Sequence, residues 1–332
     1  MSGGEGTSIV VGIDEAGYGP MLGPLVVSAT VFRTPRELLE TNWWQRLRSA
    51  ILPRPRARDA RLAVCDSKLL SARDDGLHRL EQAALTFLSL PDERGEPRRY
   101  GPTLRRLLAQ LDPAAVAWLD EYPWYRGADF AIPAAGTADA IRTHCNAVHA
   151  GFARSGIRFV GAHVEVLPEG RFNRLLEATR NKSVVLWGQV VRLLLLACPA
   201  DEPTPVFAYI DKQGGRSRYA AGLMAAFDDA HLEIVEEGPQ RSAYRLLRRP
   251  APWMVQFVEE GERHHLPVAL ASIFSKYVRE LFMLAFNEYW SRRAPGVAPT
   301  AGYHADAERF LRQIEPHVRL MRLDRSLLIR TR

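Results

Sequence analysis

Two short apolar segments that enclose a turn rich in glycine and proline constrain the fold more than any other feature. Residues 8–14 (SIVVGID) and 25–32 (LVVSATVF) are rich in β-branched side chains, which favour strands. The connecting sequence AGYGPMLGP can only be a turn or loop, because glycine and proline interrupt regular structure. A short connection of this kind predicts that the two strands pair in antiparallel fashion.

Segments with strand and helix character alternate along the rest of the chain. Strands are predicted at 157–166, 206–211, 232–236, 243–248 and 253–258. Helices are predicted at 37–51, 75–89, 103–111, 137–154, 171–198, 267–291 and from 304 onward. This alternation predicts an α/β fold, and the antiparallel first pair makes the sheet mixed.

Composition excludes several classes of protein. Of the 332 residues, 47% are hydrophobic and 25% are charged, which is typical of a globular chain and not of a disordered or fibrous one. The longest apolar stretch, residues 184–200, contains Gln189 and Arg192, so we expect a buried helix and no membrane partner. The start, MSGGEGTS, lacks the apolar region of a signal peptide.

Three cysteines, an odd number without a CxxC pair, indicate reduced thiols in a cytoplasmic protein. They are Cys65, Cys145 and Cys198. The net charge of +6 is too small to indicate a nucleic-acid partner by itself. Two segments are locally basic, PRPRAR at 53–58 and the tail 313–332, and either could contact phosphates or be solvated surface.

Acidic residues end two of the predicted strands. Asp14 and Glu15 follow the first apolar segment, and Asp211 ends VFAYID. Each could simply cap a turn. If the two strands are neighbours, however, the carboxylates meet at one edge of the sheet. Because successive side chains of a strand point to opposite faces, Glu15 can face the same site as Asp14 only if it already lies in the turn.

A polar stripe on the helix predicted at 267–291 supplies a fourth acid. Ser272, Lys276 and Glu280 recur at every fourth position on an otherwise apolar helix. The stripe could be a solvated face with a Lys–Glu pair, or it could face a polar site.

Clustered carboxylates without histidine or cysteine are typical of sites for hard cations such as Mg²⁺ or Mn²⁺. Two such ions about 4 Å apart form a phosphodiester hydrolysis site. The sequence has no GxxxxGK[ST] or GxSxG motif, no GxGxxG after a strand and no zinc-type histidine spacing.

Six segments, taken in order, resemble motifs of the type 2 ribonucleases H, the HII/HIII branch. They are IDEAGYGPMLGPLVVSATVF, DSKLLS, LLEATRNKSVVLWGQVV, AYID, EEGERHHLPVALASIFSKYVRELF and GYHADAERFL. One such match is weak, but six in the order of the family are specific. Lys68 and Lys276 match lysines of the family's motifs.

The resemblance implies a ribonuclease H-like fold, which is a mixed five-stranded sheet with helices on both faces. Residues 8–34 and 155–312 would form the catalytic core, with 64–74 contributing. Residues 36–154 would be a large, mostly helical insertion, and 313–332 a basic tail.

The resemblance also implies an enzyme, a ribonuclease H that hydrolyses the RNA strand of RNA–DNA hybrids with two Mg²⁺ or Mn²⁺ ions, without an obligate protein partner. The metal-binding and catalytic acids would be Asp14, Glu15, Asp211 and Glu280. The residues expected to contact the nucleic acid are Gly17, Tyr18, Gly19, Ser67, Lys68, Lys276 and Tyr303.

Three departures from the family's pattern leave the substrate open. Tyr18 stands where the HII turn usually has arginine, Glu280 where the fourth acid is usually aspartate, and Lys212 where glycine follows the strand-ending aspartate. Two alternatives therefore stand beside the hybrid-specific nuclease. One is a divergent DNA or structure-specific endonuclease on the same fold, and the other is a nucleic-acid-binding protein without catalytic activity.

Overall fold

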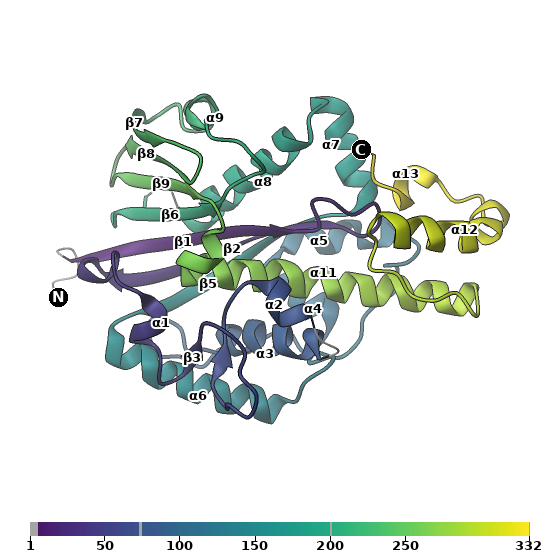
Figure 1. Ribbon diagram of the computed structural model, residues 1–332, viewed down its shortest axis with the longest axis horizontal. Coiled ribbons are helices and arrows are strands. Elements are labelled where there is room, and N and C mark those ends of the chain that lie inside the picture. Colours follow the sequence, from purple (N-terminus) through teal and green to yellow (C-terminus); the bar gives the residue numbers. More distant parts are fainter. Residues whose placement is uncertain (1–5, 73–74, 200, 332) are drawn as a thin grey trace.

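The computed structural model describes residues 6–72, 75–199 and 201–331, and a seven-stranded mixed sheet lies at its centre (Figure 1). The strands are β1 (Thr7–Ala16), β2 (Leu25–Pro35), β5 (Arg158–Leu167), β6 (Val206–Asp211), β7 (His231–Glu237), β8 (Arg241–Leu247) and β9 (Trp253–Val258). Their order is β5-β2-β1-β6-β9-β8-β7. β1 pairs with β2 in antiparallel and with β6 in parallel fashion, so the predicted mixed sheet is confirmed.

Helices cover both faces of this sheet (Figure 1). One face carries α7 (Glu169–Thr179), α8 (Lys182–Ala197) and α9 (Ala220–Ala226). The other carries α3 (Gly76–Leu88), α4 (Leu104–Leu111), α6 (Ala138–Ser155) and the long α11 (Leu266–Arg293). The remaining elements are η1 (Arg36–Leu38), α1 (Trp43–Arg46), α2 (Ser67–Ser71), α5 (Pro113–Trp118), η2 (Leu119–Glu121), α10 (Gly261–His264), α12 (His304–Leu320), α13 (Arg325–Leu328) and the small sheet of β3 (Ile51–Leu52) and β4 (Leu62–Ala63).

The alternation of side chains along β1 explains the two layers. Ile9, Val11 and Ile13 belong to the hydrophobic cluster beneath α7 and α8, whereas Val10 belongs to the cluster beneath α11. A strand that is buried on both faces has a nearly continuous apolar sequence, and residues 8–13 (SIVVGI) have such a sequence.

Gly12 lets α11 approach β1 closely. A Cβ atom at this position would lie 2.1 Å from the backbone carbon of Pro267, at the start of the helix. Only glycine fits such a contact. The polar side chains in the first turns of α11 are thereby brought to the end of β1.

Three details differ from the sequence-based expectations. The sheet has seven strands, as the apolar segments predict, instead of the five that the resemblance implies, because the β7–β8 hairpin extends it beyond β9. The helix predicted at 171–198 is two helices, since Arg180 adopts a left-handed conformation (φ 51°) and Asn181 caps α8. The helix predicted at 37–51 is only the short pieces η1 and α1, followed by β3.

The region 36–154 contains the helices α1 to α6 and the small β3–β4 sheet, and it packs on the sheet side covered by α11. Side chains of α3, α4 and α6 share one hydrophobic cluster with α11 and with Phe32 of β2. Residues 73 and 74 of the predicted 64–74 segment, residue 200 at the end of the apolar stretch and residue 332 of the tail lie outside the described residues.

Cys65, Cys145 and Cys198 are all buried and form no disulfide. Among the helices of the described residues, none combines the length and the apolar character that a membrane crossing requires.

Candidate active site

The ends of β1 and β6 place two carboxylates side by side. These neighbouring strands run parallel with Ile13 opposite Ile210, so Asp14 and Asp211 follow at the same level. Neighbouring strands lie about 4.8 Å apart. Beyond Ile13, β1 pairs only with β2, and the sheet opens at the point where the two acids emerge.

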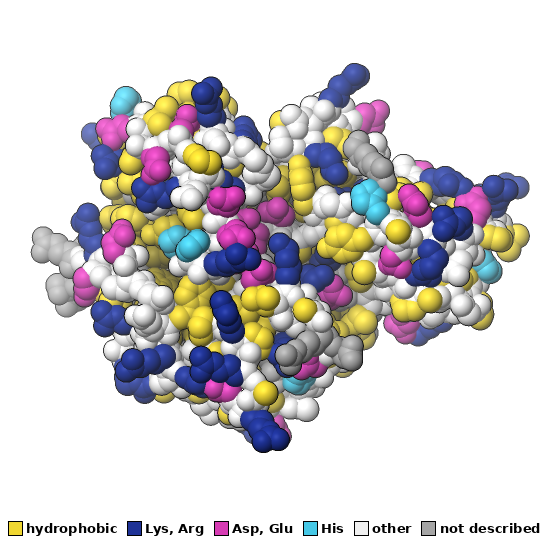
Figure 2. All heavy atoms as spheres, viewed as in Figure 1, with side chains coloured by type: hydrophobic (Ala, Val, Ile, Leu, Met, Phe, Trp, Pro, Cys, Tyr) yellow, Lys and Arg dark blue, Asp and Glu magenta, His cyan; other side chains and the backbone are white. Residues whose placement is uncertain are grey.

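A pocket of about 410 Å³ lies at this opening. Its lining residues come from six parts of the chain and are Asp14, Glu15, Ala16, Gly17, Tyr18, Asp66, Ser67, Lys68, Ser71, Asp211, Glu262, Ser272, Lys276 and Tyr303. Acidic side chains gather near the middle of this face of the molecule, with basic side chains beside them (Figure 2). The pocket therefore brings most of the residues expected at the site into one place.

Glu15 reaches the pocket although it lies within the strand. The sequence suggested that it would have to lie in the turn, but β1 continues to Ala16 and Glu15 is paired with Val27 of β2. Its backbone N–H donates to Oδ1 of Asp14 at 2.7 Å. Both carboxylates line the same pocket.

Glu280 does not line the pocket. It lies on the same stripe of α11 as Ser272 and Lys276, but eight residues beyond Ser272, which is about 12 Å along a helix. Its carboxylate accepts an ion pair from Lys276 at 2.7 Å. The structure therefore separates Glu280 from the acids of the pocket, although it shares a helix face with Ser272 and Lys276.

Glu262, which the sequence did not single out, lines the pocket beside Asp211. It lies in α10, directly after β9, the parallel neighbour of β6. The N–H of Gly261 donates to Oδ1 of Asp211 at 2.8 Å, which brings the buried Glu262 beside that aspartate. The sequence contained the signal: EEGE follows the predicted strand 253–258, just as Asp211 ends its own strand.

The short helix α2 supplies a lysine and a serine to the same pocket. Asp66 caps the helix by accepting from the N–H of Lys68 at 2.9 Å. The hydroxyl of Ser67 contacts that of Ser272 on α11 at 2.9 Å, so α2 is tied to the helix that runs along β1. Asp66 also lines the pocket, although the sequence did not single it out.

Burial, and after it the charges of neighbouring acids, raises the pKa values of the acids in the pocket. Burial, and then the charges of Glu15 and Asp211, raise the pKa of Asp14 well above its usual value. Burial is also the main cause that raises the pKa of Glu15 to about 8 and that of Asp211 to about 6. The charge of Lys68 lowers the pKa of both Glu15 and Asp211. Such a pocket favours binding of positive charge.

These residues suit a hard divalent cation in chemistry. Every acid of the pocket is a carboxylate, and neither histidine nor cysteine lines it. Within 6–72, 75–199 and 201–331, however, no group of three or more His, Cys, Asp or Glu side chains is already spaced as a metal site.

The turn beside the acids depends on glycine at two of its positions. Gly17 has a φ of 83°, and a Cβ there would lie 2.5 Å from the carbonyl oxygen of Pro24. Gly23 has a φ of 80°, and its Cβ would lie 2.5 Å from Nη1 of Arg279. At Gly19, by contrast, a Cβ would meet no atom within 4 Å. The turn is thus packed tightly against α11 and open toward solvent at Gly19.

Two tyrosines stand at the rim of the pocket. Tyr18 lies in the turn, with the ammonium of Lys182 at 5.4 Å from its ring centre. Tyr303, which precedes α12, is about half exposed. Aromatic rings in such positions can stack on nucleic-acid bases.

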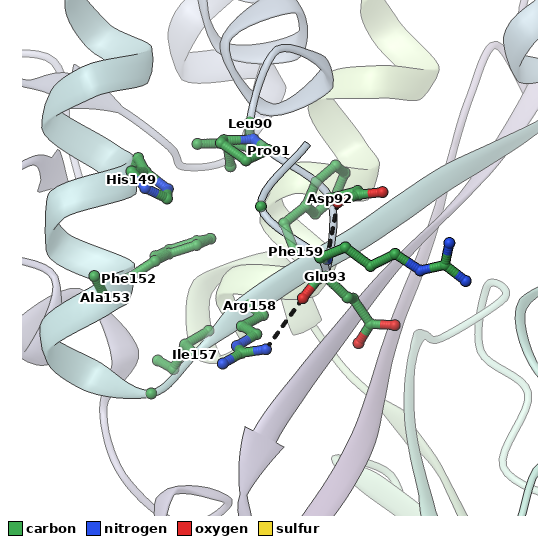
Figure 3. Close-up of a pocket in the computed structure, with 13 residues that line it drawn as sticks. Leu90, Pro91, Asp92, Glu93, His149, Phe152, Ala153, Ile157, Arg158 and Phe159 are labelled. Atoms are coloured by element: carbon green, nitrogen blue, oxygen red, sulfur yellow. Dashed lines mark hydrogen bonds between the residues drawn. The ribbon is translucent and has the colours of Figure 1, made fainter. Parts of the chain in front are cut away.

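A second cavity, of about 390 Å³, lies away from these acids (Figure 3). The loop after α3, the end of α6 and the start of β5 line it. Nη1 of Arg158 donates to the carbonyl oxygen of Glu93 across it (3.4 Å). None of the residues expected at the site lies here.

No family model matches the sequence. No curated protein matches it either. The chain is similar to solved structures of ribonucleases H at low identity. For RNase HII in the PCNA complex from Archaeoglobus fulgidus, identity is 15%, coverage is 98% of this chain and 94% of that one, and the TM-score is 0.41. For ribonuclease H2 from Pyrococcus horikoshii OT3, identity is 13%, coverage is 96% of this chain and 92% of that one, and the TM-score is 0.41. For Bst-RNase HIII in complex with Mn²⁺, identity is 16%, coverage is 98% of this chain and 66% of that one, and the TM-score is 0.38.

The chain has a mixed α/β fold in which five of the six segments that resemble type 2 ribonuclease H motifs contribute lining residues to the pocket at the ends of β1 and β6. The DSKLLS segment, which lies within the region 36–154, is brought to this pocket by α2, whose Ser67 contacts Ser272 of α11.

Proposed function

We propose that the chain is a divalent-metal-dependent endoribonuclease that hydrolyses the RNA strand of RNA–DNA hybrids. The observation that supports it best is the convergence of Asp14, Glu15, Asp211 and Glu262 on one pocket that also contains two lysines. In this proposal Glu262 takes the role that the sequence suggested for Glu280.

Mg²⁺ or Mn²⁺, when bound, would activate water and stabilise the leaving oxygen of the phosphodiester. Asp14, Glu15, Asp211 and Glu262 are the residues that would hold it. Lys68 lies close enough to lower the pKa of two of these acids, and its charge would also attract the phosphate. Lys276 of α11 adds a second positive charge to the lining of the pocket, where it is paired with Glu280.

The glycine turn would face the sugar–phosphate backbone of the RNA strand. Gly17 and Tyr18 line the pocket with the acids, whereas Gly19 follows them outside the lining, and the open space at Gly19 would let the chain of a substrate approach the backbone. Ser67 and Tyr303 complete the wall of the pocket. A ribose 2′-hydroxyl is the group by which such a turn would distinguish RNA from DNA.

Cleavage of four duplexes by one purified sample tests this function. The substrates are a uniform RNA–DNA hybrid, a DNA duplex with one ribonucleotide, an RNA duplex and a DNA duplex, each with Mg²⁺ or Mn²⁺. We expect cleavage of the hybrid in its RNA strand. Cleavage of the DNA duplex alone would indicate a DNA endonuclease, and binding without cleavage would indicate a non-catalytic protein.

A further inference from the structure

One arginine of the basic segment 313–332 is buried behind the turn that contains Gly17 and Tyr18. The side chain of Arg330 is 3% exposed. Its Nη1 donates to the carbonyl oxygen of Gly17, and its Nη2 donates to that of Tyr18 at 2.7 Å. Its backbone N–H donates to the carbonyl of Met21 at 2.9 Å. One residue thus holds three carbonyls of the turn that borders the acidic pocket.

The neighbouring helix α7 fixes this arginine from the other side. The guanidinium lies over the ring of Phe172, 4.4 Å from its centre. Asn173 ties the backbone around Arg330 to α7: its Nδ2 donates to the carbonyls of Ser326 and Ile329 at 2.8 Å, and its Oδ1 accepts from the N–H of Thr331 at 2.7 Å. Arg330 is therefore anchored independently of the turn that it holds.

A second buried arginine, Arg279, donates hydrogen bonds to the second half of the same turn, residues 22–24. Arg279 of α11 donates to the carbonyls of Pro24 (2.9 Å) and Leu22 (3.1 Å). The buried carboxylate of Glu169 accepts from the N–H of Gly23 at 2.7 Å. Arg330 holds the half of the turn that lines the pocket, and Arg279 holds the half that packs on the helix.

We propose that Arg330 is a positioning residue that fixes the Gly17–Tyr18 turn at the rim of the acidic pocket. Through this residue the segment 313–332 acts on the site by way of the turn's backbone, and the guanidinium itself touches no substrate. The planar fork of arginine can donate to two successive carbonyls at once, which the single ammonium of lysine cannot do with the same geometry. We call the hydrogen bonds from Arg330 to the carbonyls of Gly17, Tyr18 and Met21 the clamp on the turn. The role of Arg330 in substrate positioning rests on the proposed function, whereas the clamp does not.

Arg330→Met and its matched control Arg325→Met test the proposal. Both remove one positive charge from the same segment, but Arg325 is exposed and pairs with Glu315 at the surface. The first readout needs no substrate: amide hydrogen exchange of residues 16–24. We expect at least about tenfold faster exchange there in Arg330→Met, the loss expected when charge-assisted hydrogen bonds are removed, and no change in Arg325→Met. Arg330→Lys should recover only part of the protection.

The second readout is steady-state cleavage of the RNA–DNA hybrid. We expect KM to rise about tenfold or more in Arg330→Met with a smaller change in kcat, because the acids are untouched. Unchanged exchange of the turn in both Arg330→Met and Arg330→Lys would overturn the clamp, whether or not the protein is a nuclease. Faster exchange with unchanged KM and kcat would overturn the positioning role. Faster exchange in a protein whose wild type cuts no duplex would support the clamp and contradict the proposed function.

Discussion

Asp14 within β1 and Asp211 at the end of β6 lie at the same level of two neighbouring parallel strands, one residue beyond the paired Ile13 and Ile210. Their proximity is set by backbone pairing and does not depend on a flexible loop. A buried and a half-buried carboxylate in this arrangement are unfavourable for the fold alone, in line with the raised pKa values of both. Such a cost is typical of a functional site.

We predict that Asp14→Asn and Asp211→Asn each nearly abolish hybrid cleavage. Each change removes a charge from a site whose catalysis would be mostly electrostatic. Thermal unfolding of the metal-free variants should occur no lower than in the wild type, because repulsion between buried carboxylates is relieved. Retention of more than about a tenth of the activity, a loss of only ~1.4 kcal/mol, would show that the acid is not required.

Glu262 and Glu280 should differ sharply in their importance. Glu262→Gln should reduce kcat by about 100-fold or more, since it removes a carboxylate that lies beside Asp211. Glu280→Gln should keep kcat within about threefold of the wild type, because Glu280 lies outside the pocket. A change of this size is smaller than the loss of one charge-assisted hydrogen bond would cause. The reverse order of effects would restore Glu280 as the fourth acid.

The two glycines of the turn provide a comparison within one motif. Gly17→Ala should lower the free energy of unfolding by about 1–3 kcal/mol, because φ is positive and the new Cβ meets a carbonyl oxygen. Gly19→Ala should change it by less than about 1 kcal/mol, because the added methyl group meets open space. Chemical denaturation measures both, and equal losses would show that the turn is not packed as described.

A buried acid under the turn predicts a pH dependence of stability. Burial raises the pKa of Glu169 from 4.5 to about 7. A raised pKa means that the neutral form is preferred in the folded state, so its stabilising contribution is complete below about pH 4.5 and is lost as the pH rises through about 7. Glu169→Gln stays neutral at every pH. Relative to the wild type, the variant should therefore gain up to ~3 kcal/mol of stability between pH 5 and pH 8.

Denaturation of both proteins at pH 5, 6, 7 and 8 gives this difference directly. The other titrating groups are common to both chains and largely cancel in the comparison. A difference that is constant with pH, or that shrinks as the pH rises, would contradict the assignment of a raised pKa to Glu169.

Tyr18 should make the enzyme prefer a run of ribonucleotides to a single one. A tyrosine ring can stack on a base but supplies no charge to hold a phosphate in register, as arginine can. Several consecutive 2′-hydroxyls then give several chances of a productive register. The measurement is kcat/KM on a duplex with one ribonucleotide against one with four or more. Equal values, or a preference for the single ribonucleotide that persists in Tyr18→Ala, would show that Tyr18 does not set the specificity.

Much of the sheet could be predicted from the sequence, because buried strands leave a strong local signal. The apolar runs ending in Asp14 and Asp211 predict that the two acids share one edge if their strands are neighbours, and the structure pairs those strands. The place of Glu262 depends on where β9 lies in the sheet, since this residue reaches the pocket through the pairing of β9 with β6. Periodicity along α11 identifies a face of the helix but not which of its turns lies at the pocket, so the sequence predicted Glu280 and not Glu262.

The clamp behind the turn could not be predicted from local pattern. Arg330 is more than 300 residues from Gly17 in the chain, and one arginine in a basic segment gives no sign that it is buried. The break in the helix predicted at 171–198 was equally hidden, because its cause is the left-handed conformation of Arg180, a residue that normally favours helix.

The most direct test of the central claim is the initial rate at which the purified chain cuts a uniform RNA–DNA hybrid, measured with Mg²⁺, with Mn²⁺ and with excess EDTA. We predict cleavage of the RNA strand with either metal, none in EDTA, and recovery when the metal is restored. The same preparation of Asp211→Asn should be inactive under all three conditions. Cleavage that persists in EDTA, or equal rates for the wild type and Asp211→Asn, would contradict a metal-dependent nuclease built on these carboxylates.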